Sequence, residues 1–212
     1  NRGKIIQKVI NKNYDLIIFD DGLQDIQVDY DLKFVCFDVS NWVGNGFLLP
    51  AGPLREKTDN LKNYDAVFLK SNVYNEDIKK IISKVRNINS EIKIFTSKVE
   101  IRNIERFSKN KNYLIYSGIG NPKSFRNLIE INKLKIIDEF IFPDHYNYNI
   151  EDFNRLIDIA KKKDAKIITT EKDFFKIPDN FKKDIEPVKI EVNIKEESEL
   201  IDFLRSKIYE KN

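Results

Sequence analysis

Two hydrophobic patterns alternate along almost the whole chain: short apolar runs rich in β-branched and aromatic residues, and longer stretches with a helical repeat. The short runs predict strands at residues 15–19, 33–37, 65–69, 92–96, 113–117, 135–140 and 166–169, and a weaker one at 187–192. The longer stretches predict helices at residues 4–11, 75–86, 122–131, 150–162 and 194–209. This alternation favours an α/β fold with a mostly parallel sheet, in which ligands bind at the carboxyl ends of the strands.

A polar segment at residues 106–112 separates two blocks of predicted strands. At ~100–200 residues per domain, a chain of 212 residues allows one large domain or two small ones. We therefore expect residues 1–105 to end one α/β unit and residues 106–212 to form a second, smaller α/β domain.

Composition removes several classes of protein. Lys and Arg number 37 and Asp and Glu 34, so the net charge of +3 is too small and too dispersed to indicate a nucleic-acid partner. No apolar run approaches the ~18–20 residues needed to span a bilayer. The one cysteine, Cys36, excludes a disulfide within the chain, and its apolar neighbours predict a buried structural thiol. The chain begins at Asn1 and has no Met, so we expect it to be a piece of a longer protein.

The first candidate site follows the apolar run at residues 16–19, where Asp20 and Asp21 stand directly before Gly22. Carboxylates at a strand end can reach Mg²⁺, or a metal-bound water, beside a triphosphate. The same residues also suit a plain β-turn, because Asp-Gly is a strong turn dipeptide that needs no metal. These residues by themselves leave both interpretations open.

A second candidate is Arg55, which follows an irregular loop with three glycines and two prolines at residues 44–54. Its planar guanidinium suits bidentate binding of a phosphate. The alternative, which these residues alone favour, is a surface loop whose Arg55 pairs with Glu56 or Asp59.

Three more loops follow predicted strands. The glycines of residues 118–120 lack the third glycine of a dinucleotide-binding motif, so we interpret them as a tight turn before a helix capped by Asn121. The only histidine, His145, can orient or shuttle a proton, or be structural. Thr170 and Asp173 have the spacing of a capping box that opens a short helix, and Lys172 can point an ammonium toward the same edge.

The order of these motifs, at residues 20–24, 44–56, 118–122, 142–145 and 169–173, resembles the tetraacyldisaccharide 4'-kinase family of lipid A biosynthesis. The resemblance implies a P-loop-like parallel sheet, of which residues 1–105 form the end, and a smaller C-terminal α/β domain. It also implies ATP and Mg²⁺ as cofactors, a lipid A disaccharide 1-phosphate precursor as substrate, and work at the cytoplasmic face of the bacterial inner membrane.

Carried over motif by motif, the resemblance assigns roles to particular residues. Asp20 and Asp21 match the acidic pair that supports Mg²⁺ and ATP, and Gln24 is expected to steady their loop. Arg55 matches an arginine near the transferring phosphate or the lipid headgroup. His145 matches a histidine that pairs with a catalytic aspartate, which in the family precedes the segment matched here.

One family feature is missing, because no G-x-x-x-x-G-K-[ST] phosphate loop occurs in the sequence. We therefore expect the C-terminal two-thirds of a kinase, inactive alone. Two rival functions stay open: a non-catalytic α/β binding module, and a nucleotide-sugar-dependent, glycosyltransferase-like enzyme that uses the acidic pair for a metal-bound diphosphate. Oligomeric state and acyl-chain preference are not predicted by the sequence.

Overall fold

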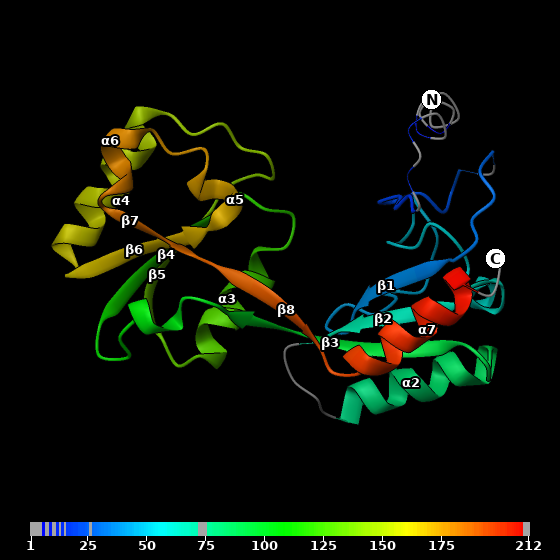
Figure 1. Ribbon diagram of the computed structural model, residues 1–212. Helices are drawn as coiled ribbons and strands as arrows, with labels where there is room; N and C mark the ends of the chain where they lie inside the picture. The colour runs from blue at the N-terminus through cyan, green and yellow to red at the C-terminus, as the bar shows by residue number, and fades with distance from the viewer. Residues whose placement is uncertain are drawn as a thin grey trace. The chain divides into compact units, whose positions relative to one another are not determined.

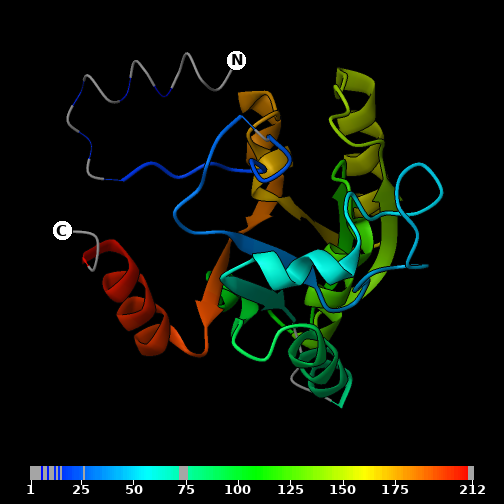
Figure 2. The ribbon, with the colours of Figure 1, turned by 90° about the vertical axis from the view of Figure 1, so that its right-hand side faces the viewer.

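A computed structural model describes residues 6, 9, 12, 14, 16–25, 27–71 and 76–209 (Figures 1 and 2). The chain forms two compact units, of which unit 1 comprises Asn1–Thr96 with Ile194–Asn212 and unit 2 comprises Ser97–Asn193. The chain therefore passes from unit 1 into unit 2 within strand β3 (Lys93–Ile101) and returns at the end of strand β8 (Ile190–Ile194).

The first sheet has the strand order β1-β2-β3-β8. The described part of unit 1 also contains β1 (Phe34–Asp38), the 3-10 helix η1 (Thr58–Asn63), β2 (Ala66–Lys70), α2 (Glu76–Ile88) and α7 (Glu197–Tyr209). Strands β1 and β2 are parallel and in continuous register, with Phe34 opposite Ala66. The βαβ connection from β2 through α2 to β3 agrees with the expected α/β class.

Helices α2 and α7 cover opposite faces of this sheet, as the side-chain alternation of β2 requires. Val67 and Leu69 are fully buried in a cluster with Val85 of α2. Ala66, on the other face, is buried with Leu200 of α7. Successive side chains of a strand point to opposite faces, so each helix covers one set.

Unit 2 contains a second sheet, wholly parallel, with the order β5-β4-β6-β7. Its strands are β4 (Asn112–Ser117), β5 (Lys135–Ile141), β6 (Ala165–Thr170) and β7 (Ile185–Val188). Its helices are η2 (Ile104–Arg106), α3 (Pro122–Ile131), α4 (Ile150–Lys162), α5 (Glu171–Phe174) and α6 (Asp179–Lys182).

Helices lie on both faces of the unit 2 sheet. Ile115 of β4 is buried with Ile129 of α3, whereas Leu114 is buried on the other face with Phe153 of α4. From β4 the chain goes to β5 on one side and then to β6 on the other, so the strand order reverses beside β4. In parallel sheets with such a reversal, ligands bind outside the carboxyl ends of the strands, and the loops after β4, β5 and β6 lie at those ends here.

Most predicted helices and strands of both units are confirmed, and their first residues lie within two residues of the predicted ones. Helices α3 and α4 have the predicted bounds. The predicted strand at 187–192 is instead two strands, β7 and β8, separated at Lys189. The last helix begins at Glu197 rather than at residue 194, because Ile194 belongs to β8. The predicted helix at 4–11 lies outside the described residues except for residues 6 and 9.

The compact units also differ from the predicted division at residue 105/106. The crossing lies at Thr96/Ser97, and residues 194–212 belong with unit 1 rather than with the second domain. The physical reason is hydrophobic contact, because Phe203 of α7 packs against Phe34 and Phe95 of the first sheet. A long-range contact of this kind has no local signature in the sequence.

Two expectations about unit 1 are wrong. The described residues 16–19 form no strand, and Ile18 is 85% exposed. An apolar, β-branched run favours a strand only where a neighbouring strand supplies backbone partners. Cys36 is exposed rather than buried. Val35 and Phe37 take the β1 positions that face the α2 core, and alternation turns Cys36 to the opposite face.

Candidate functional site

The acidic pair after residue 19 lies in a turn rather than at a strand end. Asp21 has a left-handed backbone with φ of 52°, and the next residue, Gly22, is buried. The Tyr30 hydroxyl donates a hydrogen bond to the Gly22 carbonyl at 2.7 Å, which anchors the turn. A β-carbon on Gly22 would lie 2.9 Å from the β-carbon of Phe19, so only glycine fits here without displacement. The turn leaves both Asp20 and Asp21 exposed.

The glycine- and proline-rich loop folds back on itself and presents Arg55. The Leu49 N–H donates to the Leu54 carbonyl at 2.8 Å, and these two residues bracket a tight reversal of the backbone. Gly52 sits inside this reversal, where a β-carbon would overlap the Phe47 carbonyl oxygen. The loop therefore has a defined conformation that ends directly at Arg55.

A continuous polar network joins the two loops. Arg55 Nη1 forms an ion pair with Asp21 and donates a second hydrogen bond to Gln24 Oε1 at 3.2 Å. Gln24 Nε2 in turn donates to Glu56 at 3.2 Å. Glu56 also accepts the Tyr64 hydroxyl at 2.7 Å. The partner of Arg55 is thus Asp21 and not Glu56 or Asp59, as the surface-loop interpretation expected.

The hydrogen bonds of the network favour the charged form of Glu56. The hydrogen bond from Asn60, followed by those from Tyr64 and Gln24, lowers the pKa of Glu56 against the opposing effect of desolvation. Desolvation and the bond to Glu56 raise the pKa of Tyr64 to about 12, so Tyr64 stays a hydrogen-bond donor. Asp20 is exposed, and no residue in the described ranges donates a hydrogen bond to it. A metal-bound anionic ligand would therefore meet the carboxylate of Asp21, which is paired with Arg55, and that of Asp20, which is available.

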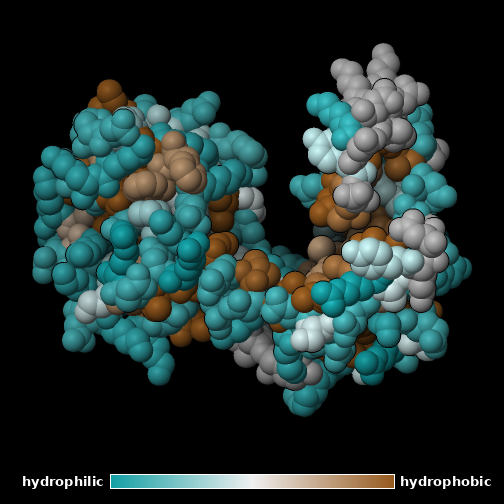
Figure 3. All heavy atoms as spheres, in the orientation of Figure 1, coloured by the Kyte–Doolittle hydropathy of each residue, from teal (hydrophilic) through white to brown (hydrophobic). Residues whose placement is uncertain are grey.

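These loops border a cavity of about 950 Å³ within unit 1. Its apolar lining includes Leu16, Phe34 and Leu204, and Asp20 and Arg55 are among its polar residues. In the space-filling view, brown hydrophobic residues are exposed among the teal ones on this unit, the lobe on the right (Figure 3). The cavity is of the size and mixed polarity typical of small-molecule sites.

Within the part of the chain that the structure describes, no three His, Cys, Asp or Glu side chains gather as a metal site. Two carboxylates nevertheless suit Mg²⁺, which usually keeps waters and is bound by one or two carboxylates together with substrate phosphates. The donor set at Asp20 and Asp21 therefore fits Mg²⁺ with a bound nucleotide, although Asp21 also serves Arg55.

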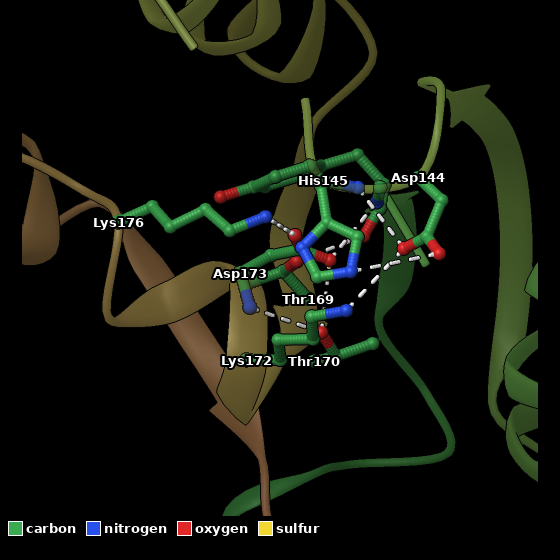
Figure 4. Close-up of polar contacts among 9 residues, drawn as sticks. Asp144, His145, Thr169, Thr170, Lys172, Asp173 and Lys176 are labelled. Carbon is green, nitrogen blue, oxygen red and sulfur yellow. Dashed lines mark hydrogen bonds and ion pairs between the residues drawn. The ribbon is translucent and has the colours of Figure 1, made fainter. Parts of the chain in front are cut away.

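A second polar cluster lies at the carboxyl ends of the unit 2 strands (Figure 4). Asp173 of α5 is completely buried and accepts hydrogen bonds from the Gly118 N–H at 2.9 Å, the Thr170 hydroxyl at 2.9 Å and Lys176 Nζ at 3.0 Å. Desolvation opposes ionisation, but these hydrogen bonds lower the pKa of Asp173 overall. The turn after β4 and the turn after β6 are thus joined through one buried carboxylate.

His145 lies in the loop after β5, in the same unit. Its backbone is left-handed, with φ of 58°, and its N–H donates to Asp144 Oδ1 at 3.0 Å. The imidazole is 76% exposed, with Nε2 3.8 Å from Asp144 Oδ2. Lys172 Nζ also donates to Asp144 Oδ1, at 3.3 Å (Figure 4). Desolvation raises the pKa of Asp144, but Lys172 and then His145 lower it overall.

The structure therefore brings together Asp20, Asp21, Gln24 and Arg55 in unit 1, and it places His145 in unit 2. The predicted N-cap of α3 is confirmed, since the Asn121 side chain accepts the Ser124 N–H at 3.1 Å. The capping interaction from Thr170 to the Asp173 N–H also forms. Sequence reasoning missed that the Asp173 carboxylate reaches a different loop, because the residues before it, Thr-Thr-Glu-Lys, indicate only a helix cap.

Comparison with known proteins supports this picture. The family model described as tetraacyldisaccharide-1-P 4'-kinase matches residues 1–209. A tetraacyldisaccharide 4'-kinase of Pelagibacter ubique (strain HTCC1062) is 44% identical over 207 residues, which are 98% of this chain and 65% of that protein. One from Rickettsia akari (strain Hartford) is 37% identical over 198 residues, or 93% of this chain and 57% of that protein.

A solved structure has the same fold. It is LpxK from Aquifex aeolicus in complex with ATP, with a TM-score of 0.58, 20% sequence identity, and coverage of 89% of this chain and 56% of that chain. The α/β class and the P-loop-kinase-like parallel sheet expected from the sequence are thereby confirmed. The chain spans less than two-thirds of the length of these relatives. On the family match over nearly its whole length, the chain belongs to the tetraacyldisaccharide-1-P 4'-kinase family.

Proposed function

We propose for the whole protein the ATP- and Mg²⁺-dependent phosphorylation of the 4'-hydroxyl of a lipid A disaccharide 1-phosphate precursor. The observation that carries this proposal is the joining of the acidic turn to Arg55 in a chain whose family consists of such kinases. A carboxylate pair and a guanidinium at one cavity rim match what a magnesium triphosphate requires.

In this reaction the sugar 4'-oxygen forms a bond to the γ-phosphorus, the bond from that phosphorus to the β,γ-bridging oxygen breaks, and ADP leaves. The hydroxyl proton passes to a base. Because such transfers depend on positioning and on neutralising charge, the residues act mainly as electrostatic and geometric supports. Bound Mg²⁺ would neutralise phosphate charge, and Asp20 and Asp21 would hold it.

Arg55 is suited to the phosphoryl group because only part of its guanidinium is used by the protein. Asp21 and Gln24 both bind Nη1, and no described residue is bonded to Nη2 or Nε. Those two nitrogens can therefore donate to an anion while Nη1 keeps the side chain oriented. Gln24 connects this arrangement to Glu56 and so steadies the acidic turn.

His145 is assigned, through the resemblance of its motif, to orient the aspartate that receives the hydroxyl proton. Its exposed imidazole is compatible with contact to a further group. The substrate is a membrane lipid, so the proposed place of action is the cytoplasmic face of the bacterial inner membrane. No helix among the described residues is long and apolar enough to cross a bilayer.

The test is a chimera in which this chain replaces the matching segment of the Pelagibacter ubique relative. Transfer of labelled phosphate from ATP to tetraacyldisaccharide 1-phosphate is expected. Asp20→Asn and Arg55→Ala should each lower kcat by about 100-fold, as loss of a phosphate clamp commonly does. Asp59→Asn, at an exposed position of η1 that takes no part in the network, is the matched control and should retain parental activity.

The same chimera separates the rival functions. A folded chimera that binds ATP but transfers nothing would support the non-catalytic module. Binding of a nucleotide sugar in preference to ATP would support the glycosyltransferase-like enzyme. Titration of the chain alone with ATP and Mg²⁺ by calorimetry should show no micromolar binding, since the chain has no phosphate loop.

A further inference from the structure

Helix α5 connects the three loops that follow β4, β5 and β6 in unit 2. Its Asp173 accepts the Gly118 N–H of the turn after β4, and its Lys172 contacts Asp144 of the loop after β5. Helix α5 itself follows β6 directly, with Thr170 as its N-cap. One short segment therefore holds the carboxyl ends of β4, β5 and β6 together (Figure 4).

The base of this arrangement is rigid. Asp173 is fully buried with three donors on its carboxylate, so α5 has little freedom to shift relative to β4. A β-carbon on Gly118 would lie 2.7 Å from the Tyr148 hydroxyl, which shows how tightly this turn is packed. Lys172 therefore extends from a helix whose position is fixed by Asp173.

In the loop that carries His145, one carboxylate oxygen of Asp144 accepts two hydrogen bonds. Asp144 Oδ1 accepts both the His145 N–H, at 3.0 Å, and Lys172 Nζ, at 3.3 Å. His145 needs such support because its φ of 58° is unfavourable for a residue with a β-carbon. Without Lys172, Asp144 would be free to turn to solvent, and the backbone of His145 would lose its acceptor.

We propose that Lys172 is a positioning residue for His145 and acts through Asp144. This inference rests on the proposed function only for the role of His145 in the reaction. The ion pair is about half-exposed, with 47% and 45% of the two side chains accessible, so its contribution to overall stability is small. Its effect is on the conformation of the loop and not on whether the chain folds.

A conformational test uses the chain itself. Lys172→Met should move the backbone amide NMR signal of His145 and raise its mobility, while the melting temperature stays unchanged. Lys172→Arg should restore the signal. The matched control is Lys163→Met, because Lys163 pairs with Asp138 across 25 residues and is 46% exposed, much like Lys172. An unchanged His145 signal in Lys172→Met would overturn the proposal whatever the enzyme does.

A kinetic test uses the chimera described above. Lys172→Met should lower kcat by up to about fivefold, the largest bias that a half-exposed ion pair can exert on the conformation of the loop, with little change in the KM for ATP. Asp144→Asn should do the same, and the double variant should be no worse than either single one, because both act through one contact. Additive losses would mean independent roles and would overturn the proposal.

The outcomes distinguish the two levels of inference. If His145→Ala lowers kcat but Lys172→Met does not, the positioning role fails and the proposed function stands. If Lys172→Met moves the His145 amide but His145→Ala leaves kcat unchanged, the positioning role stands, and the assignment of His145 in the proposed function fails.

Discussion

Asp173 and Asp179 offer a direct measure of how burial changes the contribution of an ion pair. Asp173 pairs with Lys176 at 3.0 Å and Asp179 pairs with Lys182 at 2.7 Å, both with three-residue spacing. The Asp173 side chain is 0% exposed, whereas that of Asp179 is 94% exposed. The two pairs thus share chemistry and spacing but differ in access to water, and Asp173 in addition accepts hydrogen bonds from Gly118 and Thr170.

Substitution by asparagine keeps the shape of each side chain and removes its charge. At position 173 the amide oxygen can still accept from Gly118 and Thr170, but the amide group then faces Lys176 with no acceptor. Losing one hydrogen bond to a charged group should cost about 1.5–3 kcal/mol. Asp179→Asn should cost at most about 0.5 kcal/mol, because its pair is exposed to solvent.

Urea unfolding at neutral pH, followed through the amide signals of β4, measures both free energies of unfolding. The difference should also depend on pH. The folded state lowers the pKa of Asp173 below the ordinary value of 3.8, so its stabilisation is complete above that value and is lost as the pH falls through the folded pKa. Wild type and Asp173→Asn should therefore converge in acid. Equal losses for Asp173→Asn and Asp179→Asn, or a difference that grows in acid, would refute the reasoning.

Three further outcomes are expected. Gly118→Ala should destabilise the fold by about 1–3 kcal/mol by overpacking against the Tyr148 hydroxyl, which would lie 2.7 Å from the new carbon. Gly120→Ala, whose nearest neighbour would be 3.4 Å away, should unfold at nearly the wild-type urea concentration. Arg55→Lys keeps the charge but not the several nitrogens, so kcat of the chimera should fall about tenfold or more, and wild-type kcat would contradict a bidentate role. Desolvation and then a nearby carboxylate raise the pKa of Cys36, so the pH midpoint of its alkylation by iodoacetamide should lie above that in urea, and a lower midpoint would contradict the assigned environment.

Local interactions explain why so many elements were predictable. Helix α4 begins after Asn149, whose side chain accepts the Asp152 N–H at 2.9 Å. The Asp152 carboxylate in turn accepts the Asn149 N–H. Its buried face is spaced at helical intervals, and both signals are written within a few residues of sequence. Strand β4 of unit 2 contains a continuous apolar run at residues 113–116, because the sheet is buried on both faces there.

The candidate site was predictable only in its parts. The order of the motifs identified Asp20, Asp21, Arg55 and His145 as candidates, but no spacing along the chain indicated that Arg55 would pair with Asp21 across 34 residues. The run before Asp20 has the composition of a strand and yet forms none among its described residues. The hydrophobic pattern indicates which secondary structure a segment favours, but a strand forms only where another strand lies beside it.

The α/β class, most helix and strand positions, the family and the candidate residue types follow from the amino-acid sequence, because they depend on local periodicity, capping and motif order. Three features became visible only in the folded chain: residues 194–212 return to unit 1, Cys36 is exposed, and Asp173 is a buried link between two loops. Each of these depends on contacts between residues distant in the chain, whose free energy is set by burial and mutual geometry and leaves no periodic trace in the sequence.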